Sequence, residues 1–244
     1  SIYFGGGTPS LLSAEEIDWL IGLIQTDYNV SDTAEITLEA NPDDLTRQKI
    51  IDLSKTPINR LSIGIQSFFE DDLKSMNRAH NAEEAKECLA LATRYFNNIS
   101  IDLIYGIPNA SNEQWLKNIE LALSYNIPHI SSYALTVEPK TALASFIEKG
   151  VIDDVDDAQA QEQFHLLSDR LDEVGFVHYE LSNFGKEGFF SKNNSAYWKG
   201  KHYLGIGPSA HSFNGTQRSW NVANNTKYIK AISKNELPRE IETL

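Results

Sequence analysis

The chain has 244 residues, of which 41% are hydrophobic and 23% charged, and its formal net charge is −13. This length suits one large α/β domain or a barrel-like domain with a small appendage. The acidic excess argues against a nucleic-acid backbone or an anionic membrane surface as a partner. No apolar run approaches the roughly 20 residues of a membrane-spanning helix, and no secretory signal opens the chain, so we expect a cytoplasmic protein.

Strand-like and helical segments alternate along the first 138 residues. A strand at 1–4 runs into three glycines, and Ser13-Ala14-Glu15-Glu16 is typical of the capping box that begins a helix. The expected strands that follow are 35–39, 60–65, 99–104 and 129–135, and the expected helices are 43–54, a stretch from residue 70, 82–95 and 112–125. Five consecutive βα-type units predict a parallel sheet with covering helices and right-handed crossovers.

The pattern changes from about Pro139 onward. Helices are expected at 142–149, 156–174 and 226–233, strands at 176–181 and 203–206, and a polar, aromatic loop at 183–201. We therefore predict a partial barrel over residues 1–138 and a small α+β extension over residues 139–244.

Polar residues stand where the predicted strands end. Glu39, Gln66 and Asp102 close three strands, and the glycine run Gly5–Thr8 closes the first. Ligands of α/β sheets bind at this carboxyl edge, so we expect these groups and Arg78 to converge on one cleft. Each has a structural alternative: a helix cap for Glu39, a loop partner for Gln66 and a surface ion pair for Arg78. Asp102, inside an apolar strand, needs partners in either case.

These motifs, in this order and spacing, resemble the radical S-adenosylmethionine (SAM) superfamily. They are most similar to the branch of oxygen-independent coproporphyrinogen III oxidase and its haem-chaperone relatives. The resemblance runs from Tyr3 to about Asn221, and it implies a partial (β/α)6 TIM-type barrel that lacks its first strand here. It also implies SAM contacts, shared between one or two SAM molecules, for Gly5, Gly6, Gly7, Thr8, Glu39, Gln66, Arg78, Asp102, Thr136 and His211.

The superfamily's 4Fe–4S cluster is held by a Cys-x3-Cys-x2-Cys loop, which the resemblance places just before the first strand of this chain. The chain has a single cysteine, Cys88, in a helical pattern typical of a small buried residue. Since such a cluster needs several thiolates, we expect none on this chain and no radical activity. We interpret the chain as a fragment of a longer protein that carries the cluster. An ordinary barrel isomerase that binds phosphate at the glycine loop would leave the other motifs unexplained.

Two segments favour the haem-chaperone branch. Residues 205–212 match its Gly-x-Gly-x-x-Ala-His-Ser pattern and supply His211, although this histidine could instead hydrogen-bond the 205–208 turn. Residues 193–198 match its His-Asn-x-x-Tyr-Trp pattern except that Asn193 replaces the histidine, and asparagine does not replace imidazole at iron. The candidate haem contacts are His178, Asn194, Tyr197, Trp198 and His211. We expect haem or a porphyrin and a haem-acceptor protein as partners; the alternative is a genuine oxidase that decarboxylates porphyrinogen propionates.

Overall fold

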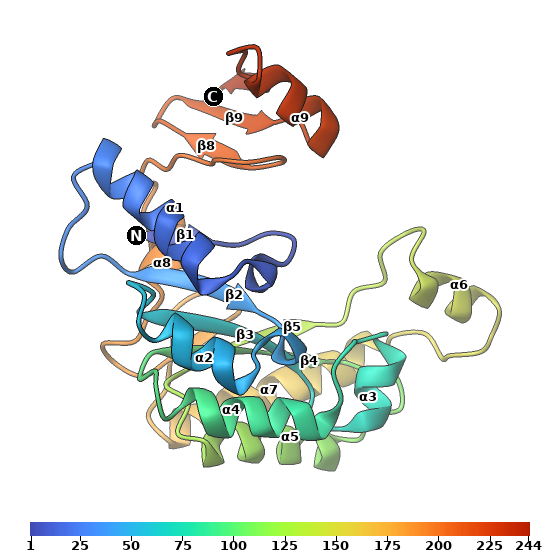
Figure 1. Cartoon of the computed structure of the whole chain (residues 1–244). Helices are drawn as coiled ribbons and strands as arrows, with labels where there is room; N and C mark the ends of the chain where they lie inside the picture. The colour runs from blue at the N-terminus through green and yellow to red at the C-terminus, as the bar shows by residue number, and fades with distance from the viewer. The chain divides into compact units, whose positions relative to one another are not determined.

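The computed structural model describes all 244 residues as two compact units, Ser1–Phe190 and Ser191–Leu244 (Figure 1). Strands from beyond residue 138 join the sheet of the first unit. The division predicted at residue 138 stays a prediction.

A seven-stranded sheet forms the centre of the first unit, in the order β1-β2-β3-β4-β5-β7-β6. Neighbouring strands from β1 to β5 are parallel, whereas β7 pairs antiparallel with both β5 and β6. The mainly parallel α/β fold class is as predicted. The strands are β1 (Ile2–Phe4), β2 (Ile36–Ala40), β3 (Arg60–Gln66), β4 (Ile99–Tyr105), β5 (His129–Ala134), β6 (Val177–His178) and β7 (Asn183–Gly185).

Helices connect the parallel strands, and α2, α4 and α5 lie along one side of them in Figure 1. The expected capping box begins α1: Glu16 N–H donates to Ser13 Oγ at 3.1 Å, and Ser13 N–H donates to the Glu16 carboxylate at 2.7 Å. The helices of this unit are α1 (Ala14–Asp27), α2 (Arg47–Leu53), α3 (Glu70–Ser75), α4 (Ala82–Ala92), α5 (Asn112–Ser124), α6 (Ala142–Glu148) and α7 (Asp157–Glu173).

The two faces of the parallel strands differ in polarity because successive side chains point to opposite faces. On the helix-covered face, Leu38, Ile63, Ile101 and Ile130 are fully buried in one apolar core. The alternate positions on the same strands carry polar residues or glycine: Thr37, Glu39, Ser62, Gly64, Ser100, Asp102 and Ser131. This polar face holds the candidate site.

Several predicted boundaries were wrong. The helix expected over 43–54 is a 3-10 turn, Pro42–Asp44, followed by α2, which begins after Thr46 accepts a hydrogen bond from Lys49 N–H. The strand expected over 176–181 is only β6. The loop expected over 183–201 contains β7 and α8 (Lys192–Trp198), because tertiary pairing with β5 and the Ser191 cap give this polar segment regular structure.

The second unit holds an antiparallel sheet in the order β10-β9-β8, together with α8 and α9 (Asn225–Ile232). Its strands are β8 (His211–Phe213), β9 (Gln217–Asn221) and β10 (Arg239–Thr243). The strand expected over 203–206 is a single bridge between Tyr203 and Phe213. Gly205 lies so close to the His211 backbone that an added Cβ would be 2.2 Å from its carbonyl oxygen. None of the helices combines the length and the hydropathy that a membrane-spanning segment needs.

Candidate functional site

The glycine loop after β1 is joined to Glu39 on β2. Gly6 and Gly7 have φ values of 74° and 66°, in the left-handed region that favours glycine. Gly6 N–H donates to Glu39 Oε2 at 3.1 Å, and the Tyr3 hydroxyl donates to Glu39 Oε1 at 2.7 Å. The helix-cap alternative for Glu39 is wrong, because Asn41 occupies the N-cap position of the next turn. Glu39 therefore presents a carboxylate fixed by two donors.

The close approach of Gly5 to this pair explains the need for glycine there. A Cβ at Gly5 would lie 2.5 Å from Tyr3 Cε1 and 2.9 Å from Glu39 Oε1. Any side chain at this position would displace the Tyr3–Glu39 hydrogen bond. Tyr3 was not among the predicted site residues, since its role depends on a contact across 36 residues of sequence.

The ends of the Gln66 and Arg78 side chains both lie next to Gly64 on β3. An added Cβ at Gly64 would lie 2.9 Å from Gln66 Nε2 and 3.4 Å from Arg78 Nη2. Gln66 has a φ of 65°, a strained conformation for a residue other than glycine and one that clusters at functional sites. Arg78 Nη2 donates to Asn41 Oδ1 at 2.9 Å, while Arg78 Nε is buried without a partner. The guanidinium thus keeps a buried donor for an anionic group.

We expect Gly64→Ala to impair ligand binding while leaving the fold intact. The new methyl group would meet the ends of two flexible side chains rather than backbone, so Gln66 and Arg78 would shift and the strand would not. The affinity for the ligand, measured by calorimetry, should fall at least severalfold. The urea concentration at the midpoint of unfolding should stay near that of the wild type. Unchanged binding would show that the Gln66–Arg78 arrangement does not contribute to affinity.

A buried polar network holds the loop that follows Gln66. Phe68 N–H donates to Asn118 Oδ1 at 2.7 Å, and Ser67 Oγ donates to Asp72 Oδ2 at 2.6 Å. Asn118, on α5, also donates to Ser67 Oγ at 3.1 Å. Because buried polar groups are costly when unpaired, this network fixes the loop between β3 and α3, directly after the strained Gln66.

Asp102 on β4 is the second carboxyl group of the site. Burial, and then the nearby Glu39 carboxylate, raise the pKa of Asp102 to about 7, although the Arg78 and Arg60 charges act in the opposite direction. Burial and the Asp102 charge likewise raise the pKa of the Tyr133 hydroxyl, on β5, to about 12. Glu39, Arg78 and Asp102 thus lie near enough to interact electrostatically.

The remaining predicted SAM residues have less defined surroundings. Thr8 is half-buried and its carbonyl accepts from Leu11 N–H at 3.1 Å, while Thr136 is exposed beyond β5.

Cys88 is buried on α4, where desolvation raises the pKa of its thiol to about 12. No group of three or more His, Cys, Asp or Glu side chains is arranged to hold a metal ion.

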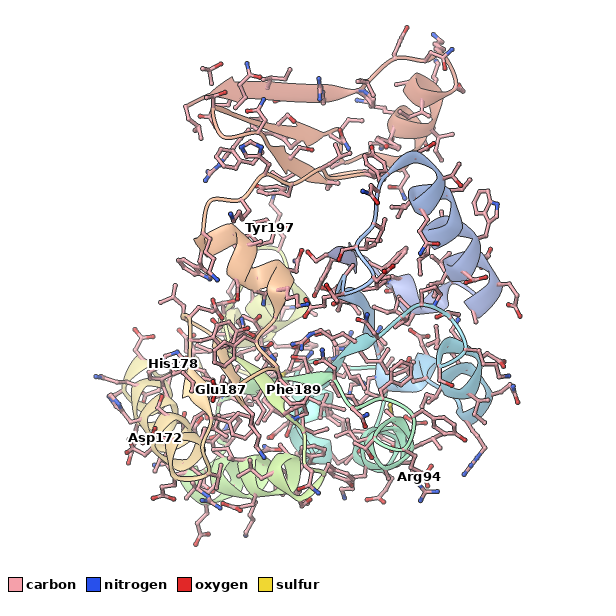
Figure 2. The ribbon with its side chains drawn as sticks, turned by 90° about the vertical axis from the view of Figure 1, so that its left-hand side faces the viewer. Arg94, Asp172, His178, Glu187, Phe189 and Tyr197 are labelled. Atoms are coloured by element: carbon pink, nitrogen blue, oxygen red, sulfur yellow. The ribbon has the colours of Figure 1, made fainter.

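One haem candidate, His178, lies in the first unit (Figure 2). Its ring stacks on Phe184 with a centroid distance of 4.2 Å, and its Nε2 hydrogen-bonds the Leu181 carbonyl at 3.2 Å. These two contacts engage Nε2 and one face of the imidazole, so His178 is constrained by its neighbours although it is exposed.

The other haem candidates lie in the second unit. Asn194, Tyr197 and Trp198 belong to α8, where Tyr197 meets Tyr203 edge-on at 4.7 Å (Figure 2). His211 is exposed and its ring lies 6.2 Å from that of Trp220. The expected alternative role for His211 is not found, because Ser212 and Asn221 hold the 205–208 turn instead.

The second unit also has a hollow of about 440 Å³ on its three-stranded sheet, which no sequence pattern predicted. His211 pairs with Trp220 across β8 and β9 and lies on the opposite face of the sheet from Ser212 and Ser219. The hollow's lining includes His202, Leu204, Ser212, Ser219, Arg239 and Ile241.

Residues 1–122, half of the chain, match the model of the Radical SAM superfamily. The chain therefore belongs to the radical SAM superfamily, as its motifs predicted. The heme chaperone HemW of Bacillus subtilis (strain 168) is 36% identical over 240 residues, which are 98% of this chain and 63% of that protein. HemW of Haemophilus influenzae is 41% identical over 212 residues, which are 86% of this chain and 54% of that protein.

The structure of coproporphyrinogen III oxidase (HemN) from Escherichia coli, a radical SAM enzyme, confirms the fold. It superposes with a TM-score of 0.81 and 23% identity, covering 99% of this chain and 59% of HemN. The chain thus spans less than two thirds of the length of these relatives.

The superfamily implies SAM and a 4Fe–4S cluster, and the residues present fit the two differently. The unpartnered buried Nε of Arg78 suits a carboxylate, and the fixed Glu39 carboxylate suits a cationic group. The cluster needs several thiolates, whereas the 244 residues hold one buried cysteine. The site therefore fits SAM, and these 244 residues supply no set of thiolates for the cluster.

Proposed function

We propose that this chain is the SAM-binding part of a radical SAM protein that handles haem, as the name of its HemW relatives indicates for them. The observation that carries the SAM site is the pairing of a fixed carboxylate, Glu39, with a guanidinium, Arg78, that keeps a buried donor unused. An amino acid tail presents the opposite charges, an ammonium and a carboxylate.

In this proposal the site residues contact different parts of SAM. Glu39 receives the ammonium group, and Arg78 receives the carboxylate. Gln66 and Asp102 face the nucleoside portion. When bound beside a reduced cluster, SAM supplies a carbon radical; the residues described here bind and orient it.

We expect Arg78→Ala to weaken SAM binding by about 10- to 150-fold, since a hydrogen bond to a charged group contributes about 1.5–3 kcal/mol. Titration calorimetry of the 244-residue chain measures this loss. The matched control is Arg94→Ala, which removes an exposed arginine just beyond α4 (Figure 2) and should leave affinity unchanged. Equal affinity for wild type and Arg78→Ala would contradict the assignment of Arg78 to the carboxylate.

Haem binding is proposed for the same protein, with His211 as the leading candidate ligand. Its imidazole is exposed, whereas that of His178 is engaged by Leu181 and Phe184. Asn194, Tyr197 and Trp198 offer polar and aromatic surface but no imidazole. A haem-acceptor protein completes the proposed role. The relatives' names favour this role over porphyrinogen oxidation, because the likeness to HemN supports the fold alone.

We expect His211→Ala to shift the Soret band and lower haem affinity, while His178→Ala changes neither. His202→Ala is a comparison variant, because His202 lines the hollow on the three-stranded sheet. If only His202→Ala altered the Soret band, the iron ligand would be His202 and the assignment of His211 would be wrong.

A further inference from the structure

One buried hydrogen bond joins the loop that carries Arg78 to the strand that ends in Gln66. His80 lies in the same loop between α3 and α4, and its ring Nε2 is 3.1 Å from the Ile65 carbonyl oxygen on β3. The His80 side chain is fully buried. The imidazole therefore links, inside the protein, the two segments that supply the amide and the guanidinium of the proposed site.

The Ile65 carbonyl also closes a γ-turn at Gln66. Ser67 N–H donates to this oxygen at 2.8 Å, and Gln66, between the two residues, has a φ of 65°. A γ-turn with a positive central φ is rare and strained, and such conformations persist only where the surrounding structure holds them. The pairing of β3 with β4 shifts register between Ile63 and Gln66, so the sheet is irregular where the turn lies.

The bond from His80 constrains this turn through the peptide group that it contacts. A carbonyl oxygen can accept two hydrogen bonds, and here one comes from Ser67 N–H and the other from the imidazole. Because the peptide group is planar, fixing the Ile65 carbonyl also fixes the direction of the Gln66 N–H. His80 therefore acts on the backbone at the residue whose conformation is strained.

The acceptor determines which nitrogen of His80 carries hydrogen. A backbone carbonyl only accepts, so Nε2 is the protonated nitrogen. Nδ1 is buried without a hydrogen-bond partner, and the Asp43 carboxylate oxygen lies 3.9 Å from it. Burial lowers the pKa of the imidazole, so the ring is neutral at pH 7 and its single hydrogen points to Ile65.

The other end of the link is the backbone of Arg78, two residues before His80. Arg78 N–H donates to the Leu73 carbonyl at 2.9 Å, and Asn77 has a φ of 52°. The Arg78 side chain is held by one printed hydrogen bond, from Nη2 to Asn41 at 2.9 Å. With so short a connection, a shift of the imidazole moves the guanidinium as well.

We propose that His80 is a positioning residue of the SAM site: its Nε2–H donates to the Ile65 carbonyl and holds the Gln66 turn and the Arg78 loop in their ligand-binding arrangement. The imidazole acts through Gln66 and Arg78 and touches no ligand itself. This inference rests on the proposed SAM site. The alternative is a histidine that contributes packing alone, and variants of similar size distinguish the two roles.

The first test needs neither a ligand nor a substitution at the site. The ¹⁵N resonances of the histidine rings in the wild-type chain show which nitrogen carries hydrogen, and the His80 signals are those that disappear in His80→Gln. We expect hydrogen on Nε2 and none on Nδ1 at pH 7. A neutral ring protonated at Nδ1 contradicts the proposal, because its Nε2 has no hydrogen for Ile65.

Amide hydrogen exchange reports the turn itself, also without ligand. In His80→Leu, which has no donor, the Ser67 amide should exchange at least severalfold faster than in the wild type. In His80→Gln, whose amide nitrogen stands near the Nε2 position, exchange should stay close to that of the wild type. If His80→Leu does not fold, His80→Asn serves the same purpose, because its shorter side chain places the amide at the Nδ1 position. Equal Ser67 exchange in all the variants overturns the proposal.

Calorimetry with SAM then separates positioning from stability. We expect His80→Leu to weaken SAM binding by about 3- to 10-fold, as the loss of a neutral hydrogen bond predicts, and His80→Gln to retain most of the affinity. The matched control is Trp115→Phe, which removes another buried ring N–H that donates to a backbone carbonyl, that of Gln163 at 2.8 Å. This control should lower the urea midpoint by a similar amount and leave SAM affinity unchanged. If His80→Gln binds as weakly as His80→Leu, the donor has no role.

A double-mutant cycle shows whether His80 acts through Arg78. In the His80→Leu background, Arg78→Ala should reduce SAM affinity by a factor several times smaller than in the wild type, because the guanidinium is already displaced. Losses that simply multiply would overturn the coupling between the two residues. Absence of SAM binding by the wild type would overturn the proposed function instead, while the ring resonances and Ser67 exchange still decide whether His80 holds the turn.

Discussion

Replacing Trp115 with alanine should destabilise the first unit by about 3–5 kcal/mol, the usual cost of emptying a large aromatic site in a core. Trp115, on α5, is 2% exposed, and its ring lies 5.9 Å from that of Tyr105 on β4. Its indole N–H donates to the Gln163 carbonyl at 2.8 Å and so joins α5 to α7. Urea unfolding followed by circular dichroism measures the loss without relying on tryptophan fluorescence.

Trp115→Phe separates packing from hydrogen bonding. The phenyl ring retains most of the apolar contact but lacks the indole N–H that donates to the Gln163 carbonyl, so we expect a loss of about 0.5–1.5 kcal/mol. If the phenylalanine variant were as unstable as the alanine variant, the hydrogen bond rather than packing would dominate at this site.

Arg60→Ala should destabilise the protein by a comparable amount, about 3–5 kcal/mol, since it breaks a buried charged network. Arg60 is 2% exposed, and desolvation lowers the pKa of its guanidinium. Its Nη1 donates to Asn98 Oδ1 at 2.5 Å and to the Phe189 carbonyl at 3.1 Å. Removing the guanidinium takes the donor away from those acceptors and removes a positive charge that interacts with the buried Glu35.

Arg60→Met tests whether charge or volume is responsible. Methionine fills much of the same space, so a loss as large as that of alanine would assign the effect to the charge and its hydrogen bonds. Arg94→Ala, at an exposed position, should change stability by no more than about 0.5 kcal/mol. A loss below 1 kcal/mol in Arg60→Ala would contradict the structural role given to this buried arginine.

Local sequence signals determined much of the fold of the first unit. The Ser13 capping box depends on residues three apart, and the βα alternation depends on apolar spacing within single segments, so both could be predicted. Glu39 and Gln66 could be placed at the carboxyl edge for the same reason, once their strands were recognised. Asp102 was expected to close its strand as well, but β4 continues to Tyr105 and Asp102 lies in its middle. The family also followed from this order of motifs, and half of the chain matches its model.

Tertiary structure decided what these residues contact. The hydrogen bond from Tyr3 to Glu39 spans 36 residues, and the one from Ser131 to Asn183 spans 52, so neither has a local pattern in the sequence. Strand β7 forms in a segment predicted to be a loop because β5 supplies its hydrogen-bonding partner. The different surroundings of Glu39 and Asp102 have the same origin, because the donors to Glu39 and the charges around Asp102 come from neighbouring strands and the glycine loop.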